Sequence, residues 1–180
     1  MSTLFVNNLN TASGSTITIP TGKSLVGTDA ASIYAPGTVV QLVSLSDTTV
    51  TRAASSSTSF VASNITNTIT PKFNNSKIIA RVATSINNNT NNANSIVITM
   101  YRRIGSGSFS NIRDNSWGIT QGYSAASRIQ IPCIAEIVDA PATTSAVTYT
   151  LYYRTSQGIA VEVPATTSEH CEFTLMEIAQ

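Results

Sequence analysis

Charged side chains are scarce in this sequence of 180 residues. They make up 11% of the chain, against roughly 25% in an average globular domain, and serine, threonine and asparagine take their place. The formal net charge is +1, which produces no field that would attract nucleic acid or an anionic membrane surface. We therefore expect no nucleic acid and no membrane among the partners of this chain.

Long apolar runs are also missing. No stretch approaches the ~20 consecutive apolar residues that span a bilayer as a helix, and no helical period of useful length occurs. The first eight residues, from Met1 to Asn8, lack the basic start and the apolar centre of a signal peptide. We expect the chain to be made in a cytoplasm and not to be exported by the Sec route.

Residues that serve as nucleophiles and bases are few. His170 is the only histidine, and its neighbour Cys171 points to the opposite face of a strand, so the two cannot act on one reacting atom. A pair of Cys133 with His170 could form only across strands. Cys133 and Cys171 fall at inward positions of apolar strands, which favours two buried free thiols over a disulfide or a metal site.

Acidic residues of the C-terminal half are spread over several strands. They are Glu136, Asp139, Glu162, Glu169, Glu172 and Glu177. This spread favours isolated surface acids over the paired carboxylates of a glycosidase, and the acids lack the clustering of a calcium loop. Arg102 and Arg103, at a strand end, are expected to be solvated guards of a sheet edge. We expect no enzymatic activity, no metal and no cofactor.

The sequence is rich in short apolar segments with strand-like alternation. The clearest are residues 38–45, 77–83, 95–101, 128–138, 147–153, 159–163 and 171–178. Glycine, proline and asparagine separate them, and at least eight such strands indicate an all-β fold, an antiparallel β-sandwich or jelly roll. Pro132 lies inside one of these segments, which predicts a sheet edge or a bulge there.

The last of these strands, residues 171–178, is apolar on both faces. The faces carry, respectively, Cys171, Phe173 and Leu175, and Thr174, Met176 and Ile178. A half-solvated antiparallel strand should be polar on one face. Either a second sheet of this chain or an identical neighbouring chain must therefore cover the second face.

Residues 1–35 differ from the remainder. After the apolar patch of Leu4, Phe5 and Val6 the segment has too few apolar residues to bury a core of its own. We expect an extended N-terminal arm over residues 1–35, which attaches through this patch, and a β domain over residues 36–180.

An irregular segment, residues 109–127, carries the candidates for surface recognition. Phe109, Arg113, Trp117 and Tyr123 combine aromatic rings with a cation, which suits contact with a sugar or a protein. The alternative is that Trp117, the only tryptophan, plugs the core beneath a long loop.

Several short sequence segments follow one another along the chain in an order typical of one family. They are Pro36-Gly-Thr-Val-Val-Gln41, Ile69-Thr-Pro71, Asn75-Ser-Lys-Ile-Ile79, Asp139-Ala-Pro-Ala-Thr-Thr-Ser-Ala-Val-Thr-Tyr149 and Thr174-Leu-Met-Glu-Ile178. This succession resembles the C-terminal domains of tail-fibre-like virion proteins of tailed bacteriophages, particularly marine ones of the cyanophage type. The segments Leu4-Phe-Val-Asn-Asn-Leu-Asn-Thr11 and Ile19-Pro-Thr-Gly-Lys-Ser-Leu-Val26 look like the N-terminal attachment segments of such proteins.

The resemblance implies a non-enzymatic, homotrimeric, mostly β structural protein of a virion that is assembled in the bacterial host cytoplasm. Its partners would be copies of itself and, through residues 1–35, other virion proteins. A tail fibre, a head fibre or decoration, and an adaptor all stay open. The rival interpretation is a monomeric carbohydrate-binding module that contacts a host surface glycan, and a polysaccharide depolymerase comes third.

Overall fold

The computed structural model describes residues 19–27, 33–47, 50–113, 115–165 and 169–180. The chain divides into two units, residues 1–33 and residues 34–180. In the first unit, a turn is closed by a hydrogen bond of 3.0 Å that the Lys23 N–H donates to the carbonyl of Pro20. The boundary lies two residues before the one expected from the sequence.

The expected attachment residues Leu4, Phe5 and Val6 lie outside the described residues. The attachment role of the N-terminal segment therefore stays a prediction.

The described part of the second unit contains eleven strands and no helix. The strands are β1 (Val39–Asp47), β2 (Ala53–Ser55), β3 (Val61–Ile69), β4 (Lys77–Asn88), β5 (Asn94–Ile104), β6 (Ser110–Asn111), β7 (Thr120–Ser124), β8 (Ile129–Asp139), β9 (Val147–Thr155), β10 (Val161–Val163) and β11 (Cys171–Ile178). Within the same residues, no helix is long and apolar enough to cross a membrane. The all-β class predicted from the sequence is confirmed.

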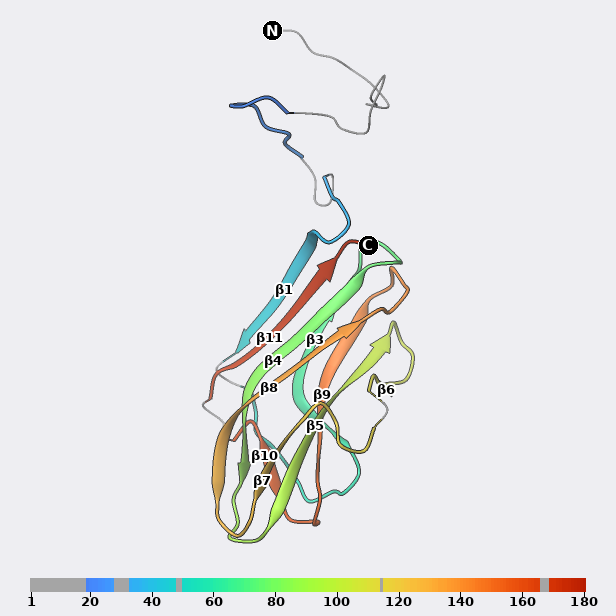
Figure 1. Ribbon diagram of the computed structural model, residues 1–180. Helices are drawn as coiled ribbons and strands as arrows, with labels where there is room; N and C mark the ends of the chain where they lie inside the picture. The colour runs from blue at the N-terminus through green and yellow to red at the C-terminus, as the bar shows by residue number, and fades with distance from the viewer. Residues whose placement is uncertain (1–18, 28–32, 48–49, 114, 166–168) are drawn as a thin grey trace. The chain divides into compact units, whose positions relative to one another are not determined.

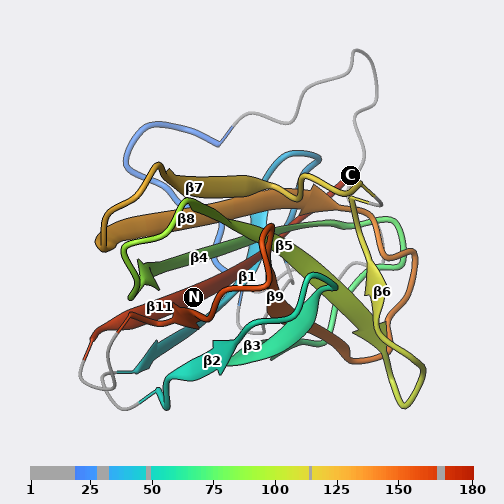
Figure 2. The same cartoon turned by 90° about the horizontal axis from the view of Figure 1, so that it is seen from below.

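The strands form two antiparallel sheets (Figures 1 and 2). In sheet A the order is β1-β11-β4-β8, and β10 with β2 continues the sheet beside the far end of β4. In sheet B the order is β3-β9-β5, and β6 and β7 both pair with the remaining edge of β5. This arrangement is consistent with the predicted antiparallel β-sandwich. β8 lies at an edge of sheet A, as Pro132 predicted.

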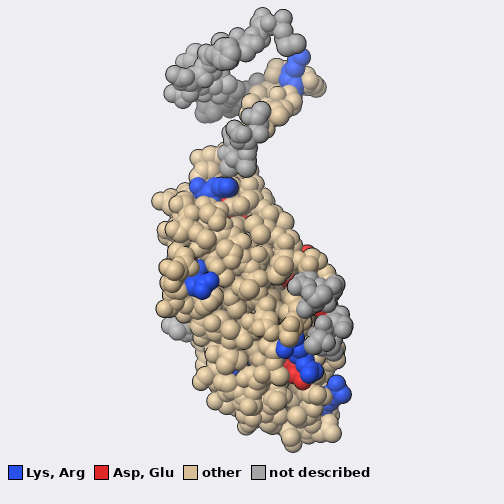
Figure 3. All heavy atoms as spheres, turned by 180° about the vertical axis from the view of Figure 1, so that it is seen from behind, with Lys and Arg blue, Asp and Glu red and all other residues tan. Residues whose placement is uncertain are grey.

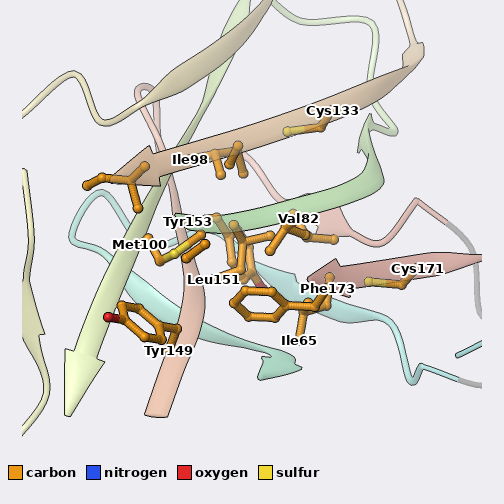
Figure 4. Close-up of a cluster of buried hydrophobic side chains, with 14 of the residues drawn as sticks. Ile65, Val82, Ile98, Met100, Cys133, Tyr149, Leu151, Tyr153, Cys171 and Phe173 are labelled. Atoms are coloured by element: carbon orange, nitrogen blue, oxygen red, sulfur yellow. The ribbon is translucent and has the colours of Figure 1, made fainter. Parts of the chain in front are cut away.

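The hydrophobic core lies between the sheets and takes side chains from both (Figure 4). Phe173 and Val82 enter it from sheet A, and Leu151, Tyr153 and Ile65 enter it from sheet B. Each of these side chains is at most 1% exposed. Burial of such a side chain contributes about 1.5–3 kcal/mol, so the period-two alternation of the strands accounts for the cohesion of the two sheets.

Successive long strands alternate between the two sheets. β3 lies in sheet B, β4 in sheet A, β5 in sheet B, β8 in sheet A, β9 in sheet B and β11 in sheet A. Each sheet is therefore assembled from segments that are distant in the sequence, and residues far apart along the chain become neighbours on its surfaces.

Candidate functional site

Trp117 lies on the surface, where the residue is 65% exposed. Its segment is fixed to sheet B: the N–H of Ile119 donates to the carbonyl of Ile98 at 2.7 Å, and the guanidinium of Arg154 donates to the carbonyl of Ser116. The interpretation of Trp117 as a plug of the core is therefore wrong. The segment covers the outer side of β5 and presents the indole to solvent.

Tyr123 is exposed to nearly the same extent, at 64%. It lies on β7 between Gly122 and Ser124, which are both buried, so alternation directs its ring away from the core. A Cβ at Gly122 would lie 2.9 Å from the Cδ1 atoms of Ile86 and Ile131. β7 therefore packs closely enough on the core to hold the Tyr123 ring outward.

Phe109, by contrast, belongs to an aromatic cluster on the outer face of sheet B. Tyr101 and Tyr152 stack with ring centroids 3.8 Å apart, and the Phe109 ring lies 6.1 Å from that of Tyr152. Phe60 extends the cluster, 6.3 Å from Tyr101 in an edge-on arrangement. Because the two tyrosine rings stack on each other, those faces are not available to a sugar ring.

Arg113 is exposed, and its N–H donates to the side chain of Asn111 at 3.1 Å. The four predicted recognition residues thus do not form one cluster. Phe109 contacts Arg103, whose Cζ lies 4.8 Å from the ring centroid. The side chain of Arg103 lines an open groove of about 510 Å³ on this face, a feature that the sequence pattern did not indicate.

The outer face of sheet A carries an apolar row across four strands. The registers place Leu42 opposite Met176, Met176 opposite Ile79, and Ile79 opposite Val138. Leu42 and Val138 are 55% and 58% exposed, and Met176 and Ile79 are half-buried. The second apolar face predicted for the last strand is therefore not covered by sheet B, which packs on the opposite face.

Three of the six C-terminal acids are buried, which corrects the expectation of isolated surface acids. They are Asp139, Glu162 and Glu177. Asp139 accepts two hydrogen bonds from Nη1 of Arg102, at 2.8 and 2.9 Å, and one of 2.8 Å from the hydroxyl of Tyr149. Burial is the main cause that raises the pKa of Tyr149, and the charge of Asp139 adds to it.

This network also corrects the expectation for Arg102 and Arg103 as solvated guards. Arg102 pairs with a buried carboxylate, and Nε of Arg103 is buried. Of the two other buried acids, Glu162 forms an ion pair of 3.1 Å with Arg52 and accepts a hydrogen bond of 2.7 Å from Nδ2 of Asn87. These carboxylates hold strands together and do not face one another.

The two thiols are buried, whereas the histidine is exposed. Cys133 and Cys171 are buried and not in a disulfide, as predicted, and burial raises the pKa of Cys133 to about 12. His170 is exposed and lies 3.5 Å from the Ser46 hydroxyl. Among the described residues, no group of three His, Cys, Asp or Glu side chains is placed to hold a metal ion.

Charged atoms are sparse on the face drawn in Figure 3, where blue and red appear only in a few separate places. The surface carries mostly hydroxyl, amide and apolar groups, in keeping with the low charge of the sequence.

Comparison with known proteins yields similarity to solved structures. No known protein family and no curated protein matches the chain. Among solved structures it is similar to "Structure of infectious bursal disease virus Gx strain", with a TM-score of 0.40 and 11% identity over 86% of this chain. The match spans 42% of the viral chain, and at this TM-score it carries no argument about function.

Proposed function

We propose that the chain is a non-enzymatic structural protein of a tailed-phage virion, of the fibre or decoration type. Its β domain associates with two further copies of itself, and residues 1–35 attach it to other virion proteins. The observation that carries the proposal is the apolar row of Leu42, Met176, Ile79 and Val138 on the outer face of sheet A.

A row of this kind favours association. The outer face of an antiparallel sheet on a monomer is ordinarily polar, and large exposed apolar patches mark interaction sites. Ile134, 54% exposed, and Val39, also 54% exposed, extend the apolar surface of the same sheet. Each Å² of apolar surface that a second copy covers contributes roughly 25 cal/mol.

The charges on this face favour a second copy as the occupant. Lys77 and Arg81 lie on the same face as Glu136 and Glu172, and Arg81 lies 3.7 Å from Glu136. Glu169 adds a further carboxylate there, bonded to Ser85 and Gln130. A face that carries charges of both signs can pair them when it meets an identical face. A nucleic acid or an anionic surface would gain nothing from it.

The strand order supports a jelly roll as the finer description of the sandwich. The orders β1-β11-β4-β8 and β3-β9-β5-β7 place eight long strands in two sheets of four. The chain passes from one sheet to the other at nearly every connection, as two interlocked Greek keys require. Jelly rolls occur in viral capsid proteins and in lectins, so this description is compatible with both candidate functions.

Light scattering after size exclusion tests the proposal. We expect a mass of three times 19.0 kDa for the purified chain. A stable monomer would remove the trimer and leave the outer face of sheet A solvated.

The second candidate function is glycan binding by a monomeric module. The exposure of Trp117 and Tyr123 favours it, because free aromatic faces stack on sugar rings. Titration with host surface polysaccharide, followed by the fluorescence of the single tryptophan, tests this candidate. Saturable quenching or a blue shift supports it, and an unchanged spectrum counts against Trp117 as the contact.

A further inference from the structure

The open groove on the outer face of sheet B, here called the Arg103 groove, has the composition of a ligand site. It is lined by Ser63, Asn64, Thr66, Thr68, Arg103, Phe109, Thr148 and Thr150. Its volume of about 510 Å³ lies within the range of small-molecule sites, roughly 300–1,000 Å³. It lies on the opposite sheet from the apolar row of sheet A.

Strand registers build the floor of the groove from two rows of side chains. Thr68 pairs with Thr148, and Thr148 pairs with Arg103, across β3, β9 and β5. The next row joins Thr66 with Thr150. The hydroxyls of each threonine pair lie 2.9 Å apart, so each pair keeps lone pairs, and one pair keeps an O–H, for a further partner.

An irregularity in β3 forms one end of the groove. Ala62 pairs with Tyr152 and Thr66 pairs with Thr150. Between these two pairs β3 advances by four residues and β9 by two, so β3 contains a bulge. The Ser63 hydroxyl donates to the carbonyl of Leu151 at 2.7 Å. This hydrogen bond gives the carbonyl a donor at the point where the backbone pairing of β3 and β9 is interrupted. Bulges of this kind redirect side chains and are frequent beside binding sites.

The bulge directs Asn64 toward the groove. Nδ2 of Asn64 donates to the carbonyl of Thr51 at 2.8 Å, which leaves the side-chain oxygen as an acceptor. The groove therefore offers both donors and acceptors of the kind that hydrogen-bond sugar hydroxyls.

Arg103 is the one cation in the groove lining, and its charge is not compensated. No described residue accepts a hydrogen bond from its guanidinium, and Nε is buried without a partner. Among the described residues, the guanidinium lies over the ring of Phe109, and its charge acts on the hydroxyl of Tyr152. The adjacent Arg102, on the other face of β5, pairs with Asp139. A half-buried guanidinium without an anion is a receptor for a carboxylate.

We propose that the Arg103 groove binds an acidic sugar residue of a surface glycan. The carboxylate of the sugar pairs with Arg103, and its hydroxyl groups bond to Thr68, Thr148 and Asn64. This inference rests on glycan binding, the second candidate function, and assigns it a ligand class and a place distinct from Trp117. It is independent of self-association, because the groove lies within one chain.

Calorimetric titration of the full chain tests the assignment. The probes are a glucuronate-containing tetrasaccharide, the same tetrasaccharide with its carboxyl groups reduced to alcohols, and inorganic phosphate. We expect the acidic tetrasaccharide to bind and the reduced one to bind at least about tenfold more weakly, since hydrogen bonds to charged groups are the stronger ones. Equal binding of the two, binding of neither, or stronger binding of phosphate would overturn the proposal.

Variants locate the site. Arg103→Gln is expected to bind the acidic tetrasaccharide at least about tenfold more weakly than the wild type. The control Arg128→Gln, at an exposed arginine outside the groove, should bind it as the wild type does. Thr68→Val, at an exposed position, provides a second test if Arg103→Gln does not fold, and it too should weaken binding. Loss of binding in Trp117→Ala with Arg103→Gln unaffected would overturn the groove in favour of Trp117.

Light scattering on the same samples separates this inference from the proposed structural role. Arg103→Gln and Thr68→Val should keep the wild-type mass while they lose the sugar. A monomeric wild type that still binds the acidic tetrasaccharide would contradict the trimer and support the groove.

Discussion

The buried carboxylate of Glu177 accepts a hydrogen bond of 2.7 Å from the hydroxyl of Ser76. The same carboxylate accepts from the backbone N–H groups of Lys72 and Phe73 and from Nε2 of Gln41. It thereby fixes the connection between β3 and β4 to the end of β11 and to β1. No cation among the described residues pairs with it, so hydrogen bonds alone stabilise the charge.

Replacement of Glu177 by Gln should destabilise the domain by about 2 kcal/mol. The amide offers one acceptor oxygen where the carboxylate offers two, and its NH₂ group faces N–H and O–H donors. Urea unfolding at neutral pH measures the loss. The reverse exchange Gln121→Glu, at an exposed position of β7, is the control and should change the free energy of unfolding by less than about 0.5 kcal/mol.

The free energy of unfolding should decrease as the pH is lowered, because Glu177 becomes protonated. Burial raises the pKa of this carboxyl, but the hydrogen bonds from Ser76, Gln41, Lys72 and Phe73 outweigh it and bring the pKa below its ordinary value of 4.5. The stabilisation is therefore fully present above the pKa of the unfolded chain and is lost as the pH falls through the lower folded pKa. Below about pH 5, the free energy of unfolding measured in urea should decrease more steeply with falling pH for the wild type than for Glu177→Gln. Parallel declines would contradict this account.

Val138→Lys should convert the assembled protein to a monomer of 19.0 kDa. The substitution places a charge in the apolar row, and a buried unpaired ammonium opposes association strongly. The side chain is more than half exposed within one chain, so the fold should persist. Gln121→Lys, on the exposed face of β7, should leave the mass unchanged. An unaltered mass for Val138→Lys would show that copies meet elsewhere.

Removal of the Arg102 guanidinium, as in Arg102→Met, should cost about 2–4 kcal/mol of unfolding free energy. The change leaves Asp139, 7% exposed, without its cation. We place the value below that of a fully buried pair because Arg102 retains access to solvent. The double variant Arg102→Met with Asp139→Asn should recover part of the loss. Additive losses in this cycle would exclude coupling between the two residues.

Gly118→Ala, in the Trp117 segment, should lower the free energy of unfolding more than Gly105→Ala does. Both glycines have positive φ, 65° and 53°, which costs an alanine roughly 1–2 kcal/mol. A Cβ at Gly118 would in addition lie 2.2 Å from the carbonyl oxygen of Ile98, whereas Gly105 faces open space. Chemical unfolding of both variants measures the difference. Equal losses would mean that the segment moves away from β5 at little cost.

The fold class could be predicted because strand alternation is a local property of the sequence. The same alternation held the signal for one buried acid: Cys171, Phe173 and Leu175 face the core, and Glu177 continues that series. An acid at this position is nevertheless expected on the surface, because charged residues are seldom buried without a cation.

The Arg103 groove could not be predicted, because all of its lining residues except Phe109 come from three strands that are distant in the sequence. Thr68, Thr148 and Arg103 become neighbours only through the register of β3, β9 and β5. The two extra residues in β3 carry no local sequence signal either. The exposure of Trp117 likewise depends on hydrogen bonds from Ile119 and Arg154 to distant partners.

Because β11 lies between β1 and β4, sheet A cannot form completely during synthesis until β11 has been made. β1 is made before the other ten described strands, but its hydrogen-bonding neighbour is β11, the last of the eleven. Until residues 171–178 have been synthesised, the edge of β1 has no partner in sheet A, and β4 also lacks one of its neighbours. Exposed strand edges of nascent chains promote aggregation. The chain is rich in asparagine, serine and threonine, and these polar side chains help to keep it hydrated during that interval.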